Sequence, residues 1–120
     1  MPLERLGIRP DLVHPLAVSP PKSRAYGRWG TWAAPALWRT LRRLRHEFPF
    51  DLVHAHNAVP AADAVLRAGV RTPLVISEHG ADVFHTAVRH PDGRAAIERA
   101  FGAARLVLAN SDGIARATQE

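Results

Sequence analysis

The sequence predicts an α/β fold, with a partial Rossmann-like parallel sheet and flanking helices. Three short apolar runs carry the prediction, at residues 50–55, 74–77 and 106–109, and each leads through small or polar residues into a helical pattern. Continuous apolar runs that alternate with helical patterns are typical of buried parallel strands joined by crossover helices. Ligands of open α/β sheets bind beyond the carboxyl ends of the strands, so the polar residues after the three runs also predict a site.

Length and composition limit the classes of protein that fit. The 120 residues form one domain or part of one, and 47% apolar residues are too many for a disordered chain. The absence of cysteine excludes disulfide bonds, a thiolate nucleophile and a cysteine zinc site. No apolar run approaches the ~20 residues of a membrane span, and we expect no secretory signal because the first residues lack an apolar stretch.

The charge balance is basic. Lys and Arg outnumber Asp and Glu by 16 to 11, and 15 of these 16 residues are arginine. Such an excess can indicate an anionic partner, such as a nucleotide, a membrane surface or nucleic acid. It can equally reflect the arginine codons of a GC-rich genome, which is the interpretation we favour for most of the excess.

We divide the chain into a loop-rich segment at residues 1–30 and an incomplete Rossmann-like domain at residues 31–120. Residues 12–18 could form a strand, which Pro15 would restrict to a sheet edge. A nucleotide-type half domain normally opens with a strand and a glycine-rich turn, whereas Gly7 stands alone. We therefore expect a domain that lacks its first strand and its glycine loop.

The first helix is predicted from about Thr31 to Pro49, where the proline ends it. Its apolar positions at helical spacing are Leu37, Leu41, Leu44 and Phe48. Trp38 lies beside them, and an aromatic residue at helical spacing is more often part of the core. Its basic positions are Arg39, Arg42, Arg43 and Arg45. A charged face opposite an apolar one is usually solvated.

Three shorter helices follow the predicted strands. Pro60 suits the first turn of a helix that stops at Gly69. Asp92 can cap the next helix, whose apolar face ends near residue 104. Ser111 or Asn110 can cap the last helix.

Three segments at these strand ends resemble motifs of glycosyltransferase family 4. They are Pro-Phe-Asp-Leu-Val-His-Ala-His-Asn at 49–57, His-Gly-Ala-Asp at 79–82 and Leu-Val-Leu-Ala-Asn-Ser at 106–111. They occur in the family's order and at its spacing, from about residue 32 to residue 120. The resemblance implies an N-terminal, acceptor-side domain of a GT-B enzyme, in which two Rossmann-like domains face a cleft.

The resemblance also implies an activity. A retaining glycosyltransferase of the hexosyl type moves a sugar from a nucleotide-sugar, which is a co-substrate, to an acceptor, with no cofactor and no metal ion. The nucleotide-sugar would bind through a C-terminal domain that is missing here, so we expect the isolated chain to be inactive. We expect a cytoplasmic location, which includes the inner face of the membrane and a peripheral contact with it, and no nucleic-acid partner.

The resemblance places the candidate site directly after the strands. His79 is the candidate catalytic residue, because a neutral imidazole there can donate to a sugar hydroxyl or to developing leaving-group charge. Gly80 would let the backbone turn and a ligand approach. The candidate substrate-binding residues are His56, Asn57, Gly80, Asp82, Asn110 and Ser111.

These side chains have structural alternatives. His79 could bond a loop carbonyl, and Asp82 could cap a short turn. Asn110 and Ser111 precede a helix whose N-terminus suits a phosphate, yet capping alone would explain both. Glu78 could act as an acid or base, or it could be a solvated loop carboxylate.

Further histidines lie near the candidate site. His54 lies deeper in its strand than His56 and is expected to be structural. His85, Arg89 and His90 are expected in a polar loop.

Two other functions stay open. His54 and His56 share a strand face, and a His-x-His pair can bind metal in a metal-dependent hydrolase, although no carboxylate cluster follows it. The arginine-bearing helix could instead lie on nucleic acid or anionic lipid, which would make the chain a basic α/β binding module for an anionic partner.

Overall fold

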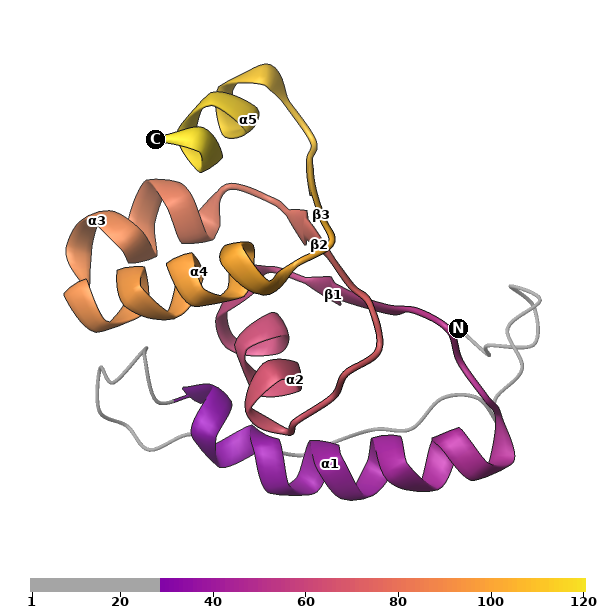
Figure 1. The fold of residues 1–120 in the computed structure, drawn as a ribbon. Helices are drawn as coiled ribbons and strands as arrows, with labels where there is room; N and C mark the ends of the chain where they lie inside the picture. The colour runs from indigo at the N-terminus through magenta and orange to yellow at the C-terminus, as the bar shows by residue number, and fades with distance from the viewer. Residues whose placement is uncertain (1–28) are drawn as a thin grey trace, which may run out of the picture.

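Figure 1 shows the computed structural model, which describes residues 29–120. Its elements are α1 (Trp29–Glu47), β1 (Val53–His56), the π-helical turn η4 (Ala58–Ala62), α2 (Asp63–Arg67), β2 (Leu74–Glu78), the π-helical turn η5 (Asp82–Thr86), α3 (Ala87–Arg89), α4 (Pro91–Ala103), β3 (Leu106–Ala109) and α5 (Asp112–Gln119). The edge strand predicted at residues 12–18 lies outside the described residues.

The three strands form one parallel sheet in the order β1-β2-β3. Val53 at the start of β1 pairs with Leu74, and Leu106 at the start of β3 pairs with Val75. Neighbouring parallel strands joined by right-handed crossovers place their connecting helices on the same face of the sheet. The predicted α/β class, with a partial Rossmann-like sheet flanked by helices, is confirmed.

The hydrophobic core lies between one face of the sheet and the helices η4, α2 and α4. Its buried members are Ala55, Ala58, Val59, Ala62, Val65, Leu74, Ile76, Ala96, Ile97 and Ala100. Many are alanines, whose small side chains allow the helix backbones to lie close to the strands. The long helix α1 packs against α2 on the outside of this layer, as Figure 1 shows along its lower edge.

The opposite face of the sheet carries exposed side chains. Successive side chains of a strand point to opposite faces, so His54 and His56 of β1 lie on the side away from Ala55. On β3, the side chains of Leu106 and Leu108 are 51% and 45% exposed. Parallel sheets are normally covered on both faces, whereas these side chains of residues 29–120 are exposed on this one, which we call the open face.

Two predictions about the first helix and strand are wrong. The first strand begins at Val53 rather than at residue 50, and its first ladder bond runs from the Val53 N–H to the Pro73 carbonyl at 3.0 Å. Trp38 and Phe48 were expected in the core, but their side chains are 45% and 56% exposed. The physical reason is that α1 packs mainly on α2, so only a narrow strip around Leu37 meets the core.

The helix ends follow the sequence signals in most places. Gly69 has φ +72° directly after α2, as the predicted stop requires. Val59 has extended φ and ψ within η4, so the helical turns resume at Pro60, as predicted. Ser111 is the N-cap of α5, and its Oγ accepts from the Ile114 N–H at 3.2 Å.

Two predictions on helix ends are wrong. Asp92 does not cap α4, because His90 is its N-cap and Pro91 its first residue, while Asp92 Oδ1 accepts from the Gly93 N–H at 2.9 Å. The segment with His85 and Arg89 is not a polar loop, since it forms η5 and α3. Backbone bonds from Phe84 N–H to the Gly80 carbonyl and from His90 N–H to the Thr86 carbonyl close these helical turns.

Candidate functional site

The carboxyl edge of the sheet brings the histidines of β1 together with the end of β2. His56 pairs with Ser77 in the parallel register, and His79 follows two residues later on the same face. The His54 Nε2 lies 2.7 Å from the Ser77 Oγ, and the His56 Nδ1 lies 2.9 Å from the His79 Nε2. Two diagonal polar pairs therefore occupy the open face of the sheet.

The His56–His79 pair has the geometry of an N–H···N hydrogen bond in the plane of both rings. The ring planes differ by 10° and their centroids lie 5.2 Å apart, while two ring nitrogens approach to 2.9 Å. The ring of His54 also contacts His56, with centroids 4.9 Å apart. His56 thus contacts both other histidines of the site.

This hydrogen bond determines what the pair presents to a ligand. One ring must donate and the other must accept, because a neutral imidazole has one N–H and one lone pair. The two remaining nitrogens, Nε2 of His56 and Nδ1 of His79, then have opposite roles, one donor and one acceptor. A neutral pair can therefore both donate a hydrogen bond to a sugar oxygen and accept one from a hydroxyl.

Gly80 forms the turn after β2 and packs closely against two neighbouring elements. It has φ +102°, which confirms the expected turn. A Cβ there would lie 3.3 Å from Ile114 Cδ1 and 3.3 Å from Phe84 Cδ2. The side where a Cβ would stand is thus filled by α5 and η5.

Asp82 holds the loop that follows β1. Its side chain is 3% exposed, and Oδ2 accepts from the Ala58 N–H at 2.6 Å and from the Val59 N–H at 3.2 Å. It therefore caps η4 from a segment more than 20 residues away in sequence. The structure therefore shows the capping role, but Asp82 caps η4 rather than η5, the turn that it begins.

Glu78 is fully buried at the end of β2, which corrects the expectation of a solvated loop carboxylate. Its Oε1 accepts from the Gly80 N–H at 2.7 Å, and Oε2 has no hydrogen-bond partner among the described residues. Burial, joined by the nearby charge of Asp82, raises the pKa of Glu78 from 4.5 to about 7, while the Gly80 N–H opposes the rise. A protonated Glu78 can donate a hydrogen bond to the Asp82 carboxylate, and this interaction favours the protonated form of Glu78.

Asn57 links the tip of β1 to β2. It has φ +71°, which asparagine tolerates better than most residues, and its N–H donates to the Ser77 carbonyl at 2.9 Å. Its Oδ1 is buried and without a partner among the described residues. As placed, the Asn57 side-chain oxygen faces the interior rather than the open face.

The last two predicted residues begin α5. The Ser111 Oγ is used by the Ile114 N–H, while Asn110 is exposed. Ile114 packs at Gly80, so the first turn of α5 lies at the same edge of the sheet as the histidines. His54 is also exposed.

Sequence reasoning missed two buried acids. Glu78 follows Leu74 and Ile76 in a period of two, and this alternation was the available signal that it faces the core. Asp63 is 1% exposed and pairs with the Arg67 Nε at 2.8 Å and the Arg99 Nη2 at 3.6 Å. Only the contact with Arg67, which lies four residues after Asp63 on α2, could have been predicted from the sequence spacing.

Two features are absent from the described residues. In residues 29–120 no group of three or more histidine, aspartate or glutamate side chains is placed to hold a metal ion. No helix in this range is long and apolar enough to cross a membrane.

Comparison with known proteins gives two findings. The sequence pattern of Glycosyltransferase Family 4 matches residues 2–120. TuaC of Bacillus subtilis (strain 168), a proposed teichuronic acid biosynthesis glycosyltransferase, is 36% identical over 88 residues, a match that covers 67% of this chain. The match covers 22% of the length of TuaC.

Proposed function

Because this chain belongs to glycosyltransferase family 4, we propose that it supplies the N-terminal, acceptor-side domain of a retaining glycosyltransferase with a GT-B fold. The reaction transfers a sugar of the hexosyl type from a nucleotide-sugar to an acceptor. Support comes from the family match over residues 2–120 and from the parallel sheet whose carboxyl edge carries the family's motif residues.

The observation that carries this proposal is the His56–His79 hydrogen bond at 2.9 Å. The two histidines come from separate motifs and meet at the edge where α/β sheets bind ligands. Their outward nitrogens supply one donor and one acceptor, which suits the hydroxyl groups of a sugar. Both side chains are exposed, so a ligand can reach them without a change in the fold.

In this proposal each motif residue has a defined role. His79 is the catalytic residue and donates to a sugar hydroxyl or to the charge that develops on the leaving group. His56 binds substrate and sets the tautomer of His79 through their shared hydrogen bond. Asn57, Asn110 and Ser111 lie in loops at the carboxyl edge of the sheet, and these loops contact the substrate.

Gly80 and Asp82 act on the substrate through the backbone that they shape. Asp82 fixes the start of η4 and therefore the loop after His56, and Gly80 sets the turn after His79. Such positioning matters because a small misplacement of a catalytic group lowers the rate substantially.

The proposal extends to cofactors and location. The enzyme uses the nucleotide-sugar as a co-substrate, with no cofactor and no metal ion. It works in the cytoplasm, including the inner face of the membrane, and has no nucleic-acid partner. These points rest on family membership.

The test is a transfer assay with this domain joined to its donor domain. We expect a labelled nucleotide-sugar to give a glycoside whose anomeric configuration is retained, as measured by NMR. The 120-residue chain alone should give no product above a buffer control. Hydrolysis without transfer, an inverted product, or transfer by the isolated chain would each contradict the proposal.

A further inference from the structure

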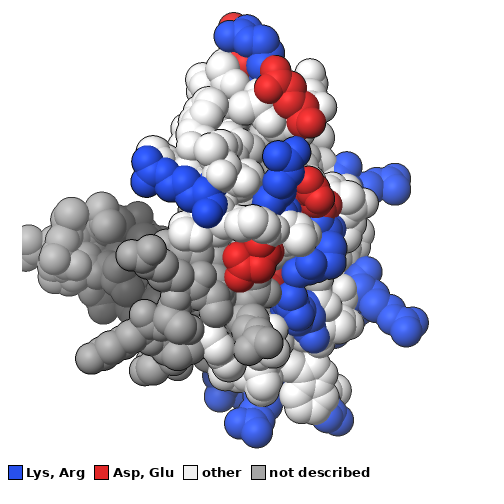
Figure 2. Space-filling model, turned by 90° about the vertical axis from the view of Figure 1, so that its left-hand side faces the viewer, with Lys and Arg blue, Asp and Glu red and all other residues white. Residues whose placement is uncertain are grey.

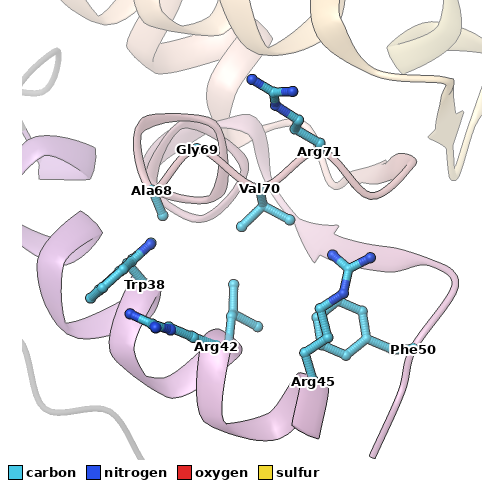
Figure 3. A pocket seen from close by; sticks show the side chains of 9 residues that line it. Trp38, Arg42, Arg45, Phe50, Ala68, Gly69, Val70 and Arg71 are labelled. Carbon is cyan, nitrogen blue, oxygen red and sulfur yellow. The ribbon is translucent and has the colours of Figure 1, made fainter.

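A pocket lies at the opposite edge of the sheet, near the amino ends of the strands. It occupies about 260 Å³ between α1 and the turn from α2 to β2, as Figure 3 shows. The lining residues are Trp38, Leu41, Arg42, Arg45, Phe50, Ala68, Gly69, Val70 and Arg71. Cations and aromatic rings are thus combined in one pocket, away from the histidine pair.

Two of the arginines rest on aromatic rings. The Arg42 Cζ lies 5.2 Å from the ring centroid of Trp38, and the Arg45 Cζ lies 5.9 Å from that of Phe50. Arg45 also donates from Nη1 to the Thr72 Oγ1 at 3.4 Å. A cation–π contact of this kind restrains a guanidinium and leaves N–H groups available to a ligand.

The pocket has a positive charge that no described acid neutralises. Its lining contains three arginines and no carboxylate. Among residues 29–120, the ion pairs involve neither Arg42, Arg45 nor Arg71. Figure 2 shows Lys and Arg side chains at the lower end of the molecule, where α1 lies in Figure 1.

The three arginines do not play the same part. In Figure 3 the Arg42 and Arg45 side chains lie on the α1 side of the pocket, whereas Arg71 points away from α1. Arg71 also lines a neighbouring hollow that includes Arg105. We therefore assign the ligand contacts to Arg42 and Arg45 and a supporting positive charge to Arg71.

We propose that this pocket binds the phosphate group of a phosphorylated ligand. Guanidinium groups match the geometry of phosphate oxygens and donate two hydrogen bonds at once. Leu41 and Val70 provide an apolar floor for the organic part of the ligand. The phosphate belongs either to a soluble phosphate ester or to the headgroup of an anionic lipid, and this assignment is independent of the sugar-transfer proposal.

The test uses the 120-residue chain with ¹⁵N-labelled arginine. Inorganic phosphate is titrated while the Nε–H signals of Arg42 and Arg45 are followed by NMR, and sodium acetate at equal ionic strength is the control anion. A second measurement is cosedimentation with phosphatidylglycerol vesicles and with phosphatidylcholine vesicles. The variant R42Q/R45Q is compared with R39Q/R43Q, which removes the same charge from the same helix outside the pocket.

We expect R42Q/R45Q to weaken binding by about tenfold or more and R39Q/R43Q to weaken it much less. A response to free phosphate assigns a soluble ligand, and binding only to phosphatidylglycerol assigns a lipid headgroup. Equal responses to acetate and phosphate, equal losses in the two variants, or no binding in either measurement would overturn the proposal. Circular dichroism melts of the two double variants establish that each protein is folded. We expect both to fold because the four substituted side chains are exposed.

Discussion

The two edges of the sheet hold their polar side chains in different ways. At the carboxyl edge, two buried acids bond the backbone: Glu78 accepts from the Gly80 N–H, and Asp82 accepts from two N–H groups of η4. At the amino edge, Arg42 and Arg45 are exposed and rest on aromatic rings. The first arrangement fixes loops from inside the protein, and the second orients side chains on its surface.

This difference predicts which substitutions should disturb distant parts of the protein and which should act only locally. Altering a buried acid at the carboxyl edge should disturb the loops that carry His56 and His79, because those loops have their hydrogen bonds to the acids. Altering an arginine at the amino edge should affect local binding alone, since an exposed cation–π contact contributes only about 0.5–1 kcal/mol. The predictions below test this contrast.

The largest effect should come from His79→Ala in the complete enzyme. We expect turnover to fall by roughly 10²–10⁴-fold if the imidazole assists proton transfer or leaving-group charge. Stability should change little, because His79 is exposed. The control is His54→Ala, which loses the exposed contact with Ser77 at 2.7 Å and should lower turnover far less than His79→Ala. Kinetics and thermal melts on both variants decide this, and a large melting loss with near-normal turnover for His79→Ala would assign that residue to structure.

Asp82→Ala should cause the next largest effect. The Ala58 and Val59 N–H groups would lose their acceptor in a buried position, which we expect to lower the free energy of unfolding by about 2–4 kcal/mol. Asp112→Ala is the control, because Asp112 is an exposed acid in the first turn of α5 and should cost less than about 1 kcal/mol. Denaturant unfolding measures both variants, and equal losses would show that the Asp82 bonds to η4 stabilise the protein no more than an exposed carboxylate does.

Glu78 should make stability depend on pH. Its pKa of about 7 in the folded state exceeds the ordinary 4.5, so between these values the folded protein binds a proton that the unfolded chain has released. The free energy of unfolding should therefore fall as pH rises from about 4.5 to 7, by up to about 3 kcal/mol. Glu78→Gln removes this titration. The part of the pH dependence of the free energy of unfolding that Glu78 causes should therefore disappear in unfolding curves recorded across this range. An unchanged slope in the variant would exclude Glu78 as its source.

The smallest effect comes from a matched pair of glycines, one at each edge. Gly69→Ala places a side chain at φ +72° in open space, which should cost about 1 kcal/mol of backbone strain. Gly80→Ala adds contacts of 3.3 Å with Ile114 and Phe84 to a similar strain, so its loss of stability should be about 1–2 kcal/mol larger. Thermal melts of the two variants test the difference. If the losses are equal, the carboxyl edge is less tightly packed than the contacts indicate.

The sequence alone determined the features that depend on neighbours in the chain. The alternation of apolar runs with helical patterns predicted the parallel sheet, and β3 has the predicted bounds of residues 106–109. Gly69, Gly80 and Ser111 were identified because positive φ and helix capping are local requirements. Such features are encoded within a few residues, so they can be read without the fold.

The tertiary structure decided the features that depend on contacts between distant segments. His56 and His79 are 23 residues apart and meet only because β1 and β2 pair in one register. The raised pKa of Glu78 follows from its burial, which depends on the helices that cover that face of the sheet. Trp38 is exposed because α1 packs on α2 instead of on the sheet. Burial, register and the distances between side chains are properties of the whole packing arrangement, and local spacing does not specify them.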